Sequence, residues 1–413
     1  MERTVYENID HLFRHQYGRI MAGLLSRFGT KNVNLVEDAV QDALLKAMKL
    51  WPHQGQPDNA AAWLYKVAQN QMLDSLKRQS KSTVLEVNKM ELTEQEYQDS
   101  TQLNDEQLQL VFACCHPNIS DKESLLLSLK LVGGFSSAEI GRALLLKEEA
   151  AKKSIQRAKS NFKEKVGSVY FPKGKELELY LNRVVRVVYL IFNEGYKPSK
   201  GASLINEDLC GEAIRLGLLL NDNKHCSGKD VQALLSLMCF KCARFEARIN
   251  SIGELLTLEN QDWKKWNQQY VQWGFYYFNL ASRSQEASSY QLEAAIEFYY
   301  HSATGYDFID WEKIGEVYRL LLLQKDSMNV KLNYLVVLEK TRGTDFALHE
   351  LTKLEGAFEG SALYHSIKAF FYENKKEFDL ALVHLEKTLL LTDNEVEQGF
   401  LKQRIQKVTK LIA

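Results

Sequence analysis

Apolar residues recur at helical spacing along most of this chain. The first such run covers residues 5–28, and Gly29 closes it because glycine readily adopts the backbone conformation that ends a helix. A second helix is predicted to open at Asn34, with Glu37 three residues further on as its capping-box partner. After a break at Pro52–Pro57, a third helix is predicted over about residues 59–77. The pattern thus predicts three helices within the first 80 residues.

A second helical unit is predicted over residues 107–165. Ser120 and Ser136 each precede a glutamate by three residues, which is the capping-box signature of a helix start, and Gly133-Gly134 ends the helix between them. A short helix over 137–144, a tight turn and a longer helix follow. The apolar face of the longer helix carries Ala151, Ile155, Ala158 and Phe162. A short helix, a tight turn and a second helix with a basic outer face form a helix-turn-helix pattern.

The remainder of the chain, from about residue 170 to residue 413, is predicted to be helical and repetitive. The pattern Ala-Leu-x-x-Leu at 347–351 recurs at 381–385, at the 34-residue period of tetratricopeptide repeats. The chain has five prolines and none beyond Pro198, which favours stacked helical hairpins over a loop-rich sheet protein. We therefore expect an all-α protein.

Charge is balanced over the whole chain but not locally. The 413 residues hold 52 Lys and Arg against 53 Asp and Glu, a net charge of −1, and 45% of them are hydrophobic. This composition excludes a disordered protein and does not by itself indicate a nucleic-acid partner. Residues 86–106, however, hold seven acids against one base, whereas residues 147–165 hold seven bases against three acids. The first segment is predicted to be a flexible or loosely helical linker, and the second offers a basic surface.

Two helices carry candidate nucleic-acid contacts. On the basic helix, Lys152, Lys153, Gln156 and Arg157 lie off the apolar stripe, where they reach base edges or phosphates, and Lys159 and Lys163 are better placed for phosphate alone. The alternative is an ordinary solvated basic face. The third predicted helix interleaves aromatic, amide and basic groups, which suits unstacked single-stranded bases, although Trp63 at helical spacing is more typical of a core position. Its candidates are Tyr65, Lys66, Asn70, Lys77 and Arg78.

The residues give little support for an acidic docking surface, a metal site, an enzyme active site or a membrane segment. Glu37, Asp38 and Asp42 form an acidic patch whose plain interpretation is a solvated helix face. Six cysteines occur without the paired spacing of a structural zinc site, so we expect thiols, no metal and no cofactor. No phosphate-binding glycine loop, nucleophile elbow or HExxH motif occurs, and an enzyme is not expected. Without a signal-peptide core or an apolar stretch of membrane-spanning length, a cytoplasmic location and no membrane contact are expected.

Taken together, these motifs resemble a known family. The run from Glu37 to Ala43 and the run from Ala62 to Asp74 resemble conserved region 2 of sigma-70 family RNA polymerase sigma factors, and residues 107–165 resemble region 4. The lack of other sigma regions resembles the extracytoplasmic-function group. Three further strings resemble its subgroup with a long tetratricopeptide-like C-terminal extension: Phe112 to Pro117, Leu131 to Gly134, and Phe192 to Tyr196.

The resemblance implies a domain plan and a role for each candidate. Residues 1–80 correspond to region 2, 81–106 to the acidic linker, 107–168 to region 4 and 169–413 to the extension. In such factors the acidic helix docks on the clamp helices of the polymerase largest subunit, which makes Glu37, Asp38 and Asp42 polymerase contacts. The following helix captures and opens the minus-ten promoter element, and the region 4 helix reads the minus-thirty-five element. The extension is thought to regulate or support the sigma core, so a contact within the chain is allowed.

Two other functions remain open at this point. The first is a helix-turn-helix DNA-binding regulator with a peptide-binding tetratricopeptide-like scaffold that never engages polymerase. The acidic helix and the segment Trp63–Asn70 distinguish it from a sigma factor, because a simple repressor needs neither. The second is a pure scaffold in which residues 1–165 are merely structural. The Phe192–Tyr196 string also has a plain structural interpretation, in which Gly195 ends a helix and the aromatic rings pack into a corner.

Overall fold

The computed structural model describes residues 16–80, 100–144, 146–197, 205–250, 255–283, 286–354 and 360–412. Within these ranges the chain forms helices joined by turns and no β-strand, apart from one isolated bridge between Ile249 and Leu255. The predicted all-α class is therefore confirmed. The start of the first predicted helix and most of the acidic linker lie outside the described residues. The chain divides into two compact units, residues 1–191 and 192–413.

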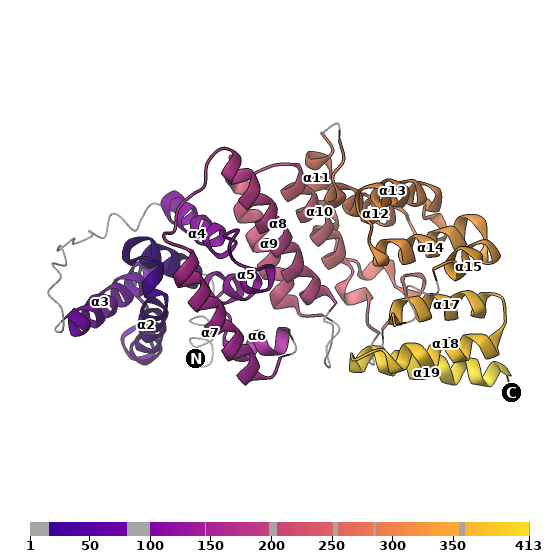
Figure 1. Ribbon diagram of the computed structural model, residues 1–413, viewed down its shortest axis with the longest axis horizontal. Helices are drawn as coiled ribbons and strands as arrows, with labels where there is room; N and C mark the ends of the chain where they lie inside the picture. The colour runs from indigo at the N-terminus through magenta and orange to yellow at the C-terminus, as the bar shows by residue number, and fades with distance from the viewer. Residues whose placement is uncertain are drawn as a thin grey trace. The chain divides into compact units, whose positions relative to one another are not determined.

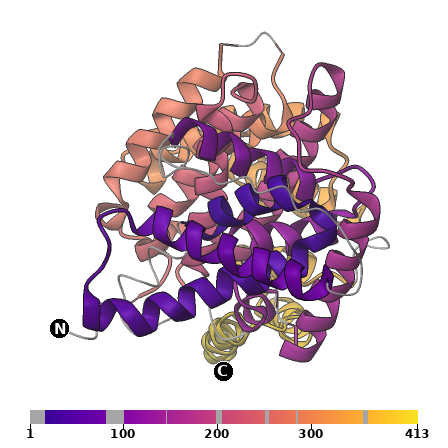
Figure 2. The same cartoon turned by 90° about the vertical axis from the view of Figure 1, so that its left-hand side faces the viewer.

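Helices of unequal length build the first unit (Figures 1 and 2). Residues 16–28 are helical, and the elements that follow are η1 (Thr30–Asn32), α2 (Val33–Gln54), α3 (Ala60–Ser80), α4 (Ser100–Cys114), α5 (Asp121–Leu127), the π-helix η3 (Ser128–Val132), α6 (Ser137–Ala143), α7 (Glu148–Lys165) and α8 (Lys175–Tyr196). α2 and α3 pack side by side, and α7 packs on α5 and α6.

The start of α2 differs from the prediction. Gly29, at φ +82°, ends the first helix as expected, but α2 begins at Val33 and its N-cap residue, Asn32, makes no side-chain cap. The capping box expected from Asn34 and Glu37 is therefore wrong. Asn34 already lies inside the helix, and Glu37 is buried and engaged elsewhere. The break expected at Pro52 is also displaced, because α2 continues through this proline to Gln54 and Gly55 follows it as the C-cap residue.

The elements from α5 to α7 follow the predicted pattern. Ser120 and Glu123 form a capping box at the start of α5, and Ser136 and Glu139 exchange the same two hydrogen bonds before α6. α6 and α7 are separated by a short connection. The expected apolar face of α7 is buried and packs the helix against the unit; its members are Ala151, Ile155, Ala158 and Phe162.

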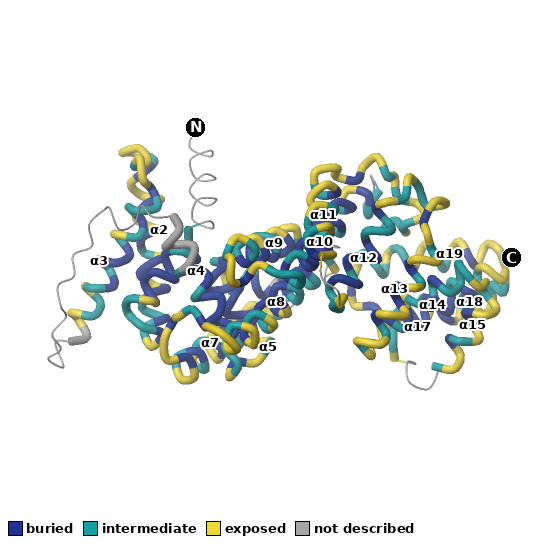
Figure 3. The backbone as a smooth tube through the Cα atoms, turned by 90° about the horizontal axis from the view of Figure 1, so that it is seen from above, coloured by how far each residue is buried: buried dark blue, intermediate teal, exposed yellow. Residues whose placement is uncertain are grey.

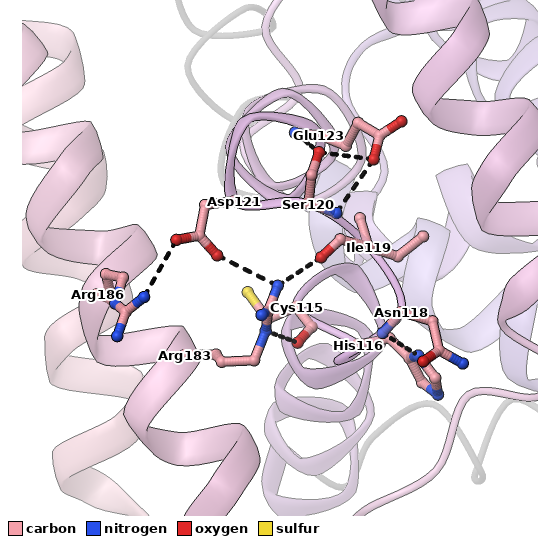
Figure 4. Close-up of polar contacts among 9 residues, drawn as sticks. All are labelled: Cys115, His116, Asn118, Ile119, Ser120, Asp121, Glu123, Arg183 and Arg186. Carbon is pink, nitrogen blue, oxygen red and sulfur yellow. Dashed lines mark hydrogen bonds and ion pairs between the residues drawn. The ribbon is translucent and has the colours of Figure 1, made fainter.

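One arginine fastens α8 to the loop between α4 and α5 (Figure 4). The Arg183 guanidinium donates hydrogen bonds to the carbonyl oxygens of Cys115 (3.1 Å) and Ile119 and lies 3.3 Å from the Asp121 carboxylate. The exposed Arg186 guanidinium lies 3.3 Å from the other carboxylate oxygen of Asp121. Arg183 thus satisfies two carbonyls that no helix uses, and the residues of α8 up to Ile191 belong to the first compact unit.

The second unit is a succession of helical pairs, in which most helices pack on their neighbours in sequence. Its elements are α9 (Glu207–Asp222), α10 (Lys229–Ala243), η4 (Phe245–Ala247), η5 (Leu258–Asn260), η6 (Trp263–Lys265), α11 (Gln268–Ala281), α12 (Ser289–Ser302), η7 (Tyr306–Phe308), α13 (Trp311–Gln324), α14 (Met328–Arg342), α15 (Thr344–Thr352), α17 (Ala362–Asn374), α18 (Phe378–Leu390) and α19 (Glu395–Ile412).

The 34-residue repeat falls on core positions of this unit. Ala347 and Leu351 lie on α15, Ala381 and Leu385 lie on α18, and all four are fully buried. Buried and exposed residues alternate along the helices, as Figure 3 shows by colour. The repeated Ala and Leu therefore lie on the faces through which these helices pack.

The Phe192–Tyr196 string occupies a packed corner. Phe192 and Tyr196 stack with ring centroids 5.8 Å apart at the end of α8. Gly195 lies against α9, where an added Cβ atom would stand 2.8 Å from the sulfur of Cys210. The Arg248 guanidinium lies 4.2 Å from the centre of the Tyr196 ring. Gly195 does not end the helix as expected, because α8 continues to Tyr196. The packing of the aromatic rings supports the other part of the structural interpretation.

A buried charge cluster adjoins this corner. Glu297 on α12 is 5% exposed, and its carboxylate lies 2.9 Å from both Lys241 and Arg244. Burial alone raises the pKa of Glu297, but the two cations outweigh this effect and lower it to about 2. His301, one turn further on, donates from Nδ1 to the Glu297 carbonyl at 2.8 Å, and burial followed by the charge of Arg244 lowers its pKa to about 4. The cluster ties α10 to α12.

Candidate functional site

The outer face of α7 carries the predicted base-reading residues. Lys152, Lys153, Gln156 and Arg157 are all exposed, opposite the buried apolar stripe. The Lys152 ammonium lies 3.0 Å from Glu148 and 3.0 Å from Glu149, within the same helix. Because these pairs are exposed to water and screened by salt, they hold the side chain only weakly. The face is therefore accessible and basic.

Lys159 does not share that face. Its side chain is only 13% exposed, and its ammonium lies 2.5 Å from the Glu37 carboxylate on α2. The structure thus joins a predicted DNA contact to a predicted polymerase contact. Residues 122 positions apart in sequence meet here because α7 packs on α2 and η1.

A second lysine completes this arrangement. Lys130 of η3 lies 3.0 Å from the other oxygen of Glu37 and also donates to the carbonyl of Phe135 at 3.2 Å. Burial raises the pKa of Glu37, but Lys130 and Lys159 outweigh this effect and hold it below its ordinary value. We call Glu37, Lys130 and Lys159 the Glu37 cluster.

Lys130 was not among the residues singled out from the sequence. The signal was available, because Lys130 is the one charged residue in the apolar run from Leu125 to Val132, and a lysine is rarely buried without a partner. The sequence alone offered no way to choose Glu37 as that partner.

The other two acidic candidates have different surroundings. Asp38 is exposed, and burial of its carboxylate together with the charges of Glu37 and Asp42 raises its pKa. Asp42 is half-buried and accepts a hydrogen bond of 2.8 Å from Gln71 on α3. The predicted acidic patch thus separates into an exposed part, Asp38, and a fully engaged part, Glu37.

The α3 candidates form a second polar surface. Lys66, Asn70 and Lys77 share one exposed face at helical spacing, and Arg78 is exposed beside them. Tyr65 is half-buried beside Gly23, where an added Cβ atom would stand 2.9 Å from its ring.

Trp63 packs edge-on against Trp51 of α2, with ring centroids 5.3 Å apart. This contact supports its structural interpretation, since the pair holds α3 to α2 and thereby orients the polar face of α3.

Three further features concern the chemistry of the described residues. All six cysteines are buried free thiols. In the part of the chain that the structure describes, no group of three His, Cys, Asp or Glu side chains is placed to hold a metal, and no helix combines the length and hydropathy needed to cross a bilayer. The second unit also has a groove of about 670 Å³ whose lining includes Tyr300, Trp311, Lys340 and Arg404.

Comparison with known proteins finds a family that is similar to the part of the chain containing α2 and α3. Residues 13–82 match the family model of sigma-70 region 2, so this part of the chain is similar to that domain. Glu37 and the polar face of α3 both lie within the matched residues. These findings support a sigma-70 family sigma factor, a class of non-enzymatic transcription initiation factors.

The other two matches are to proteins whose roles are unassigned. Residues 180–282 match a family of unknown function, DUF6596. An uncharacterized protein of Rhizobium meliloti (strain 1021) is 29% identical over 392 residues, which cover 93% of this chain and 92% of that protein. No solved structure matches.

Proposed function

We propose that this chain is a sigma factor of the extracytoplasmic-function group, which binds core RNA polymerase and directs initiation at specific promoters. The observation that carries the proposal is the sigma-70 region 2 match over residues 13–82, which contains an exposed polar face on α3. The chain supplies a second basic face on α7, outside the match. Two separate nucleic-acid surfaces on one chain suit a protein that contacts two promoter elements.

In this proposal each surface has its own partner. Asp38 and Asp42 of α2, with Glu37, dock on the clamp of the polymerase largest subunit. The α3 face, with Lys66 and Asn70 at its centre, binds the unpaired bases of the minus-ten element. The α6–α7 pair acts as a helix-turn-helix, with α7 in the major groove of the minus-thirty-five element. Lys153, Gln156 and Arg157 on α7 contact bases and phosphates there.

The extension is proposed to support or regulate the sigma core through its tetratricopeptide-like helical pairs. Its first helix, α8, is fixed to the α4–α5 loop by Arg183. A signal that reaches α8 therefore has a direct mechanical route to the helices around α7.

Run-off transcription with core RNA polymerase, on DNA from upstream of the chain's own gene, tests the proposal. The full chain is expected to direct initiation at a defined start site, and charge reversal at Lys152, Lys153 and Arg157 is expected to abolish it. Reversal of Lys173 and Lys175, which are exposed but lie outside both surfaces, is the matched control and should leave initiation intact. No initiation on any promoter would refute the sigma proposal.

A regulator that never engages polymerase is the second candidate. The same basic face on α7 favours it, because that face needs no polymerase to bind duplex DNA. It predicts a specific footprint by the chain alone, whereas a sigma factor acquires its footprint with core polymerase. If charge reversal on α7 changed neither footprint, the pure scaffold would be the remaining interpretation.

A further inference from the structure

The second unit contains a groove to which the proposed function gives no role. Its volume is about 670 Å³, within the range of about 300–1,000 Å³ that is typical of sites for small organic molecules. Its lining side chains come mainly from α12, α13, α14, α17 and α19, with the short elements η5 and η7, and all of these belong to the second unit (Figure 1). Helices that are distant in sequence therefore contribute to one site.

One corner of the groove is built from three aromatic rings. The indole of Trp311 packs edge-on against the rings of Tyr300 and Tyr306, with centroid distances of 5.9 and 5.7 Å. All three side chains line the groove, and all three are partly exposed. Aromatic side chains pack favourably against flat apolar rings, so this corner, which we call the Trp311 corner, suits a ligand with an aromatic ring.

Polar groups at the Trp311 corner have no partner within the protein. Tyr300, Trp311 and the neighbouring Tyr318 line the groove, and neither the two hydroxyls nor the indole N–H has a hydrogen-bond partner among the described residues. Tyr318 is only 8% exposed, and burial raises the pKa of both phenols, so that both stay protonated and act as donors. Because buried donors normally have acceptors, the missing partner is a group rich in acceptor oxygens.

A buried excess of positive charge adjoins the same corner. Tyr300 follows Glu297 by three residues on α12, and the charges of Glu297 and Arg244 both act on its phenol. Glu297 is the one carboxylate that Lys241 and Arg244 share, at 2.9 Å from each. Two cations against one carboxylate leave one positive charge in excess, and burial leaves it poorly screened.

The charges of the groove lining itself balance one another. Arg404 lies 2.8 Å from Glu373, and Lys340 lies 3.2 Å from its neighbour Glu339. The lining has one further charge of each sign, both exposed to water: Lys407 and Glu259. The excess therefore comes from the buried cluster, and it favours an anion at the Trp311 corner.

We propose that this groove binds a small organic anion, in which a carboxylate is attached to an aromatic ring. The ring packs against Trp311 and Tyr306, and the carboxylate accepts hydrogen bonds from the hydroxyls of Tyr300 and Tyr318. A small molecule fits better than a peptide, because the three donors and the excess charge act at a single corner. The inference does not depend on the role in transcription, since every contact that supports it lies within the second unit.

Isothermal titration calorimetry of the full chain tests the proposal. The probes are phenylacetate, naphthylacetate and anthracenecarboxylate, which have increasing ring size, and each is compared with its neutral amide. We expect at least one acid to bind with a Kd of about 1 mM or below. Its amide should bind about tenfold more weakly, because hydrogen bonds to a charged acceptor are stronger than those to a neutral one.

Two conservative variants locate the bound acid. Tyr300→Phe and Tyr318→Phe each remove a hydroxyl but keep the ring, and each should weaken the binding of the acid about tenfold. The matched control is Tyr334→Phe, because the Tyr334 ring stacks on Tyr318 with centroids 6.0 Å apart but lies outside the groove lining. This control should bind the acid like the parent chain. Thermal unfolding of each variant checks that the fold is retained.

Four results overturn the inference. The first is no binding of any of the three acids at concentrations up to about 10 mM. The second is equal binding of the acids and their amides, and the third is equal affinity of Tyr300→Phe, Tyr318→Phe and Tyr334→Phe for the acid. The fourth is an acidic peptide with a single phenylalanine that binds at least tenfold more tightly than every probe, which would identify a peptide site instead.

Discussion

Replacing the buried carboxylate Glu297 with its neutral isostere tests the charge cluster that ties α10 to α12. Glu297→Gln keeps the shape of the side chain but leaves Lys241 and Arg244 without a counter-charge in the interior. The pKa of about 2 lies about 2.5 units below the ordinary value of 4.5, and each unit corresponds to about 1.4 kcal/mol of preference for the charged form. The substitution should therefore destabilise the unit by about 3 kcal/mol, which agrees with the 3–5 kcal/mol typical of broken buried ion pairs.

Thermal and urea unfolding of the full chain measure this loss. Tryptophan emission is a suitable probe because Trp266 lies 5.9 Å from the Arg244 guanidinium. A loss of about 3 kcal/mol in a unit of this size corresponds to a fall in Tm of roughly 6–12 °C. The matched control is Glu293→Gln on the same helix, whose partner Lys325 is 43% exposed at 3.0 Å, and it should cost less than about 1 kcal/mol.

The dependence on pH follows from the same shift. The carboxyl of Glu297 is more acidic in the folded state than in the unfolded chain, so its contribution is complete above about pH 4.5 and disappears as the pH falls toward 2. Glu297→Gln should lack this acid-sensitive part of the stability. Equal costs for Glu297→Gln and Glu293→Gln, or a cost below about 1 kcal/mol for both, would refute the assignment of the cluster as the tie between α10 and α12.

The remaining predictions concern three other parts of the molecule. His301 stays neutral in the fold, with a pKa of about 4 against 6.5 for a free histidine. The free energy of unfolding of the second unit should therefore fall by about 3 kcal/mol as the pH is lowered from 6.5 to 4. In acid unfolding curves, a His301→Phe variant should lack this part of the pH dependence. Arg183→Met should cost about 2–3 kcal/mol in urea unfolding by leaving two carbonyls unsatisfied, whereas Arg186→Met, whose parent side chain is 61% exposed, should cost less than about 0.5 kcal/mol. A chain that ends at residue 168 should aggregate in size-exclusion chromatography because it lacks α8, while a chain that ends at residue 197 should stay monomeric; equal behaviour of the two would show that α8 is dispensable for the first unit.

Local sequence patterns were sufficient to predict most individual helices of residues 16–165. Capping boxes at Ser120 and Ser136, the apolar stripe of α7 and the glycine that follows the first helix all act within a few residues, so short-range chemistry determines them. The prediction failed at the start of α2. There the capping signature was coincidental, because Glu37 has a stronger electrostatic partner than the backbone at a helix end.

The candidate site likewise has a part that the sequence predicted and a part that it did not. The exposure of Lys152, Lys153, Gln156 and Arg157 followed from helical periodicity, since the side of a surface helix opposite its apolar stripe faces solvent. Helical periodicity gave no reason to separate Lys159 from them. Its burial depends on the packing of α7 against α2, a contact between residues more than a hundred positions apart.

The sequence by itself determined that this protein is all helical, that its acidic and basic segments are separate, and that its N-terminal motifs resemble sigma region 2. These properties depend on residue type and on spacing within one or two helical turns. Only the tertiary structure decided which charges meet. It paired Glu37 with Lys130 and Lys159, and it enclosed Glu297 between Lys241 and Arg244. An ion buried in the protein interior needs a counter-charge, because the interior stabilises charge poorly. The fold alone selects which oppositely charged residue lies close enough to be that partner.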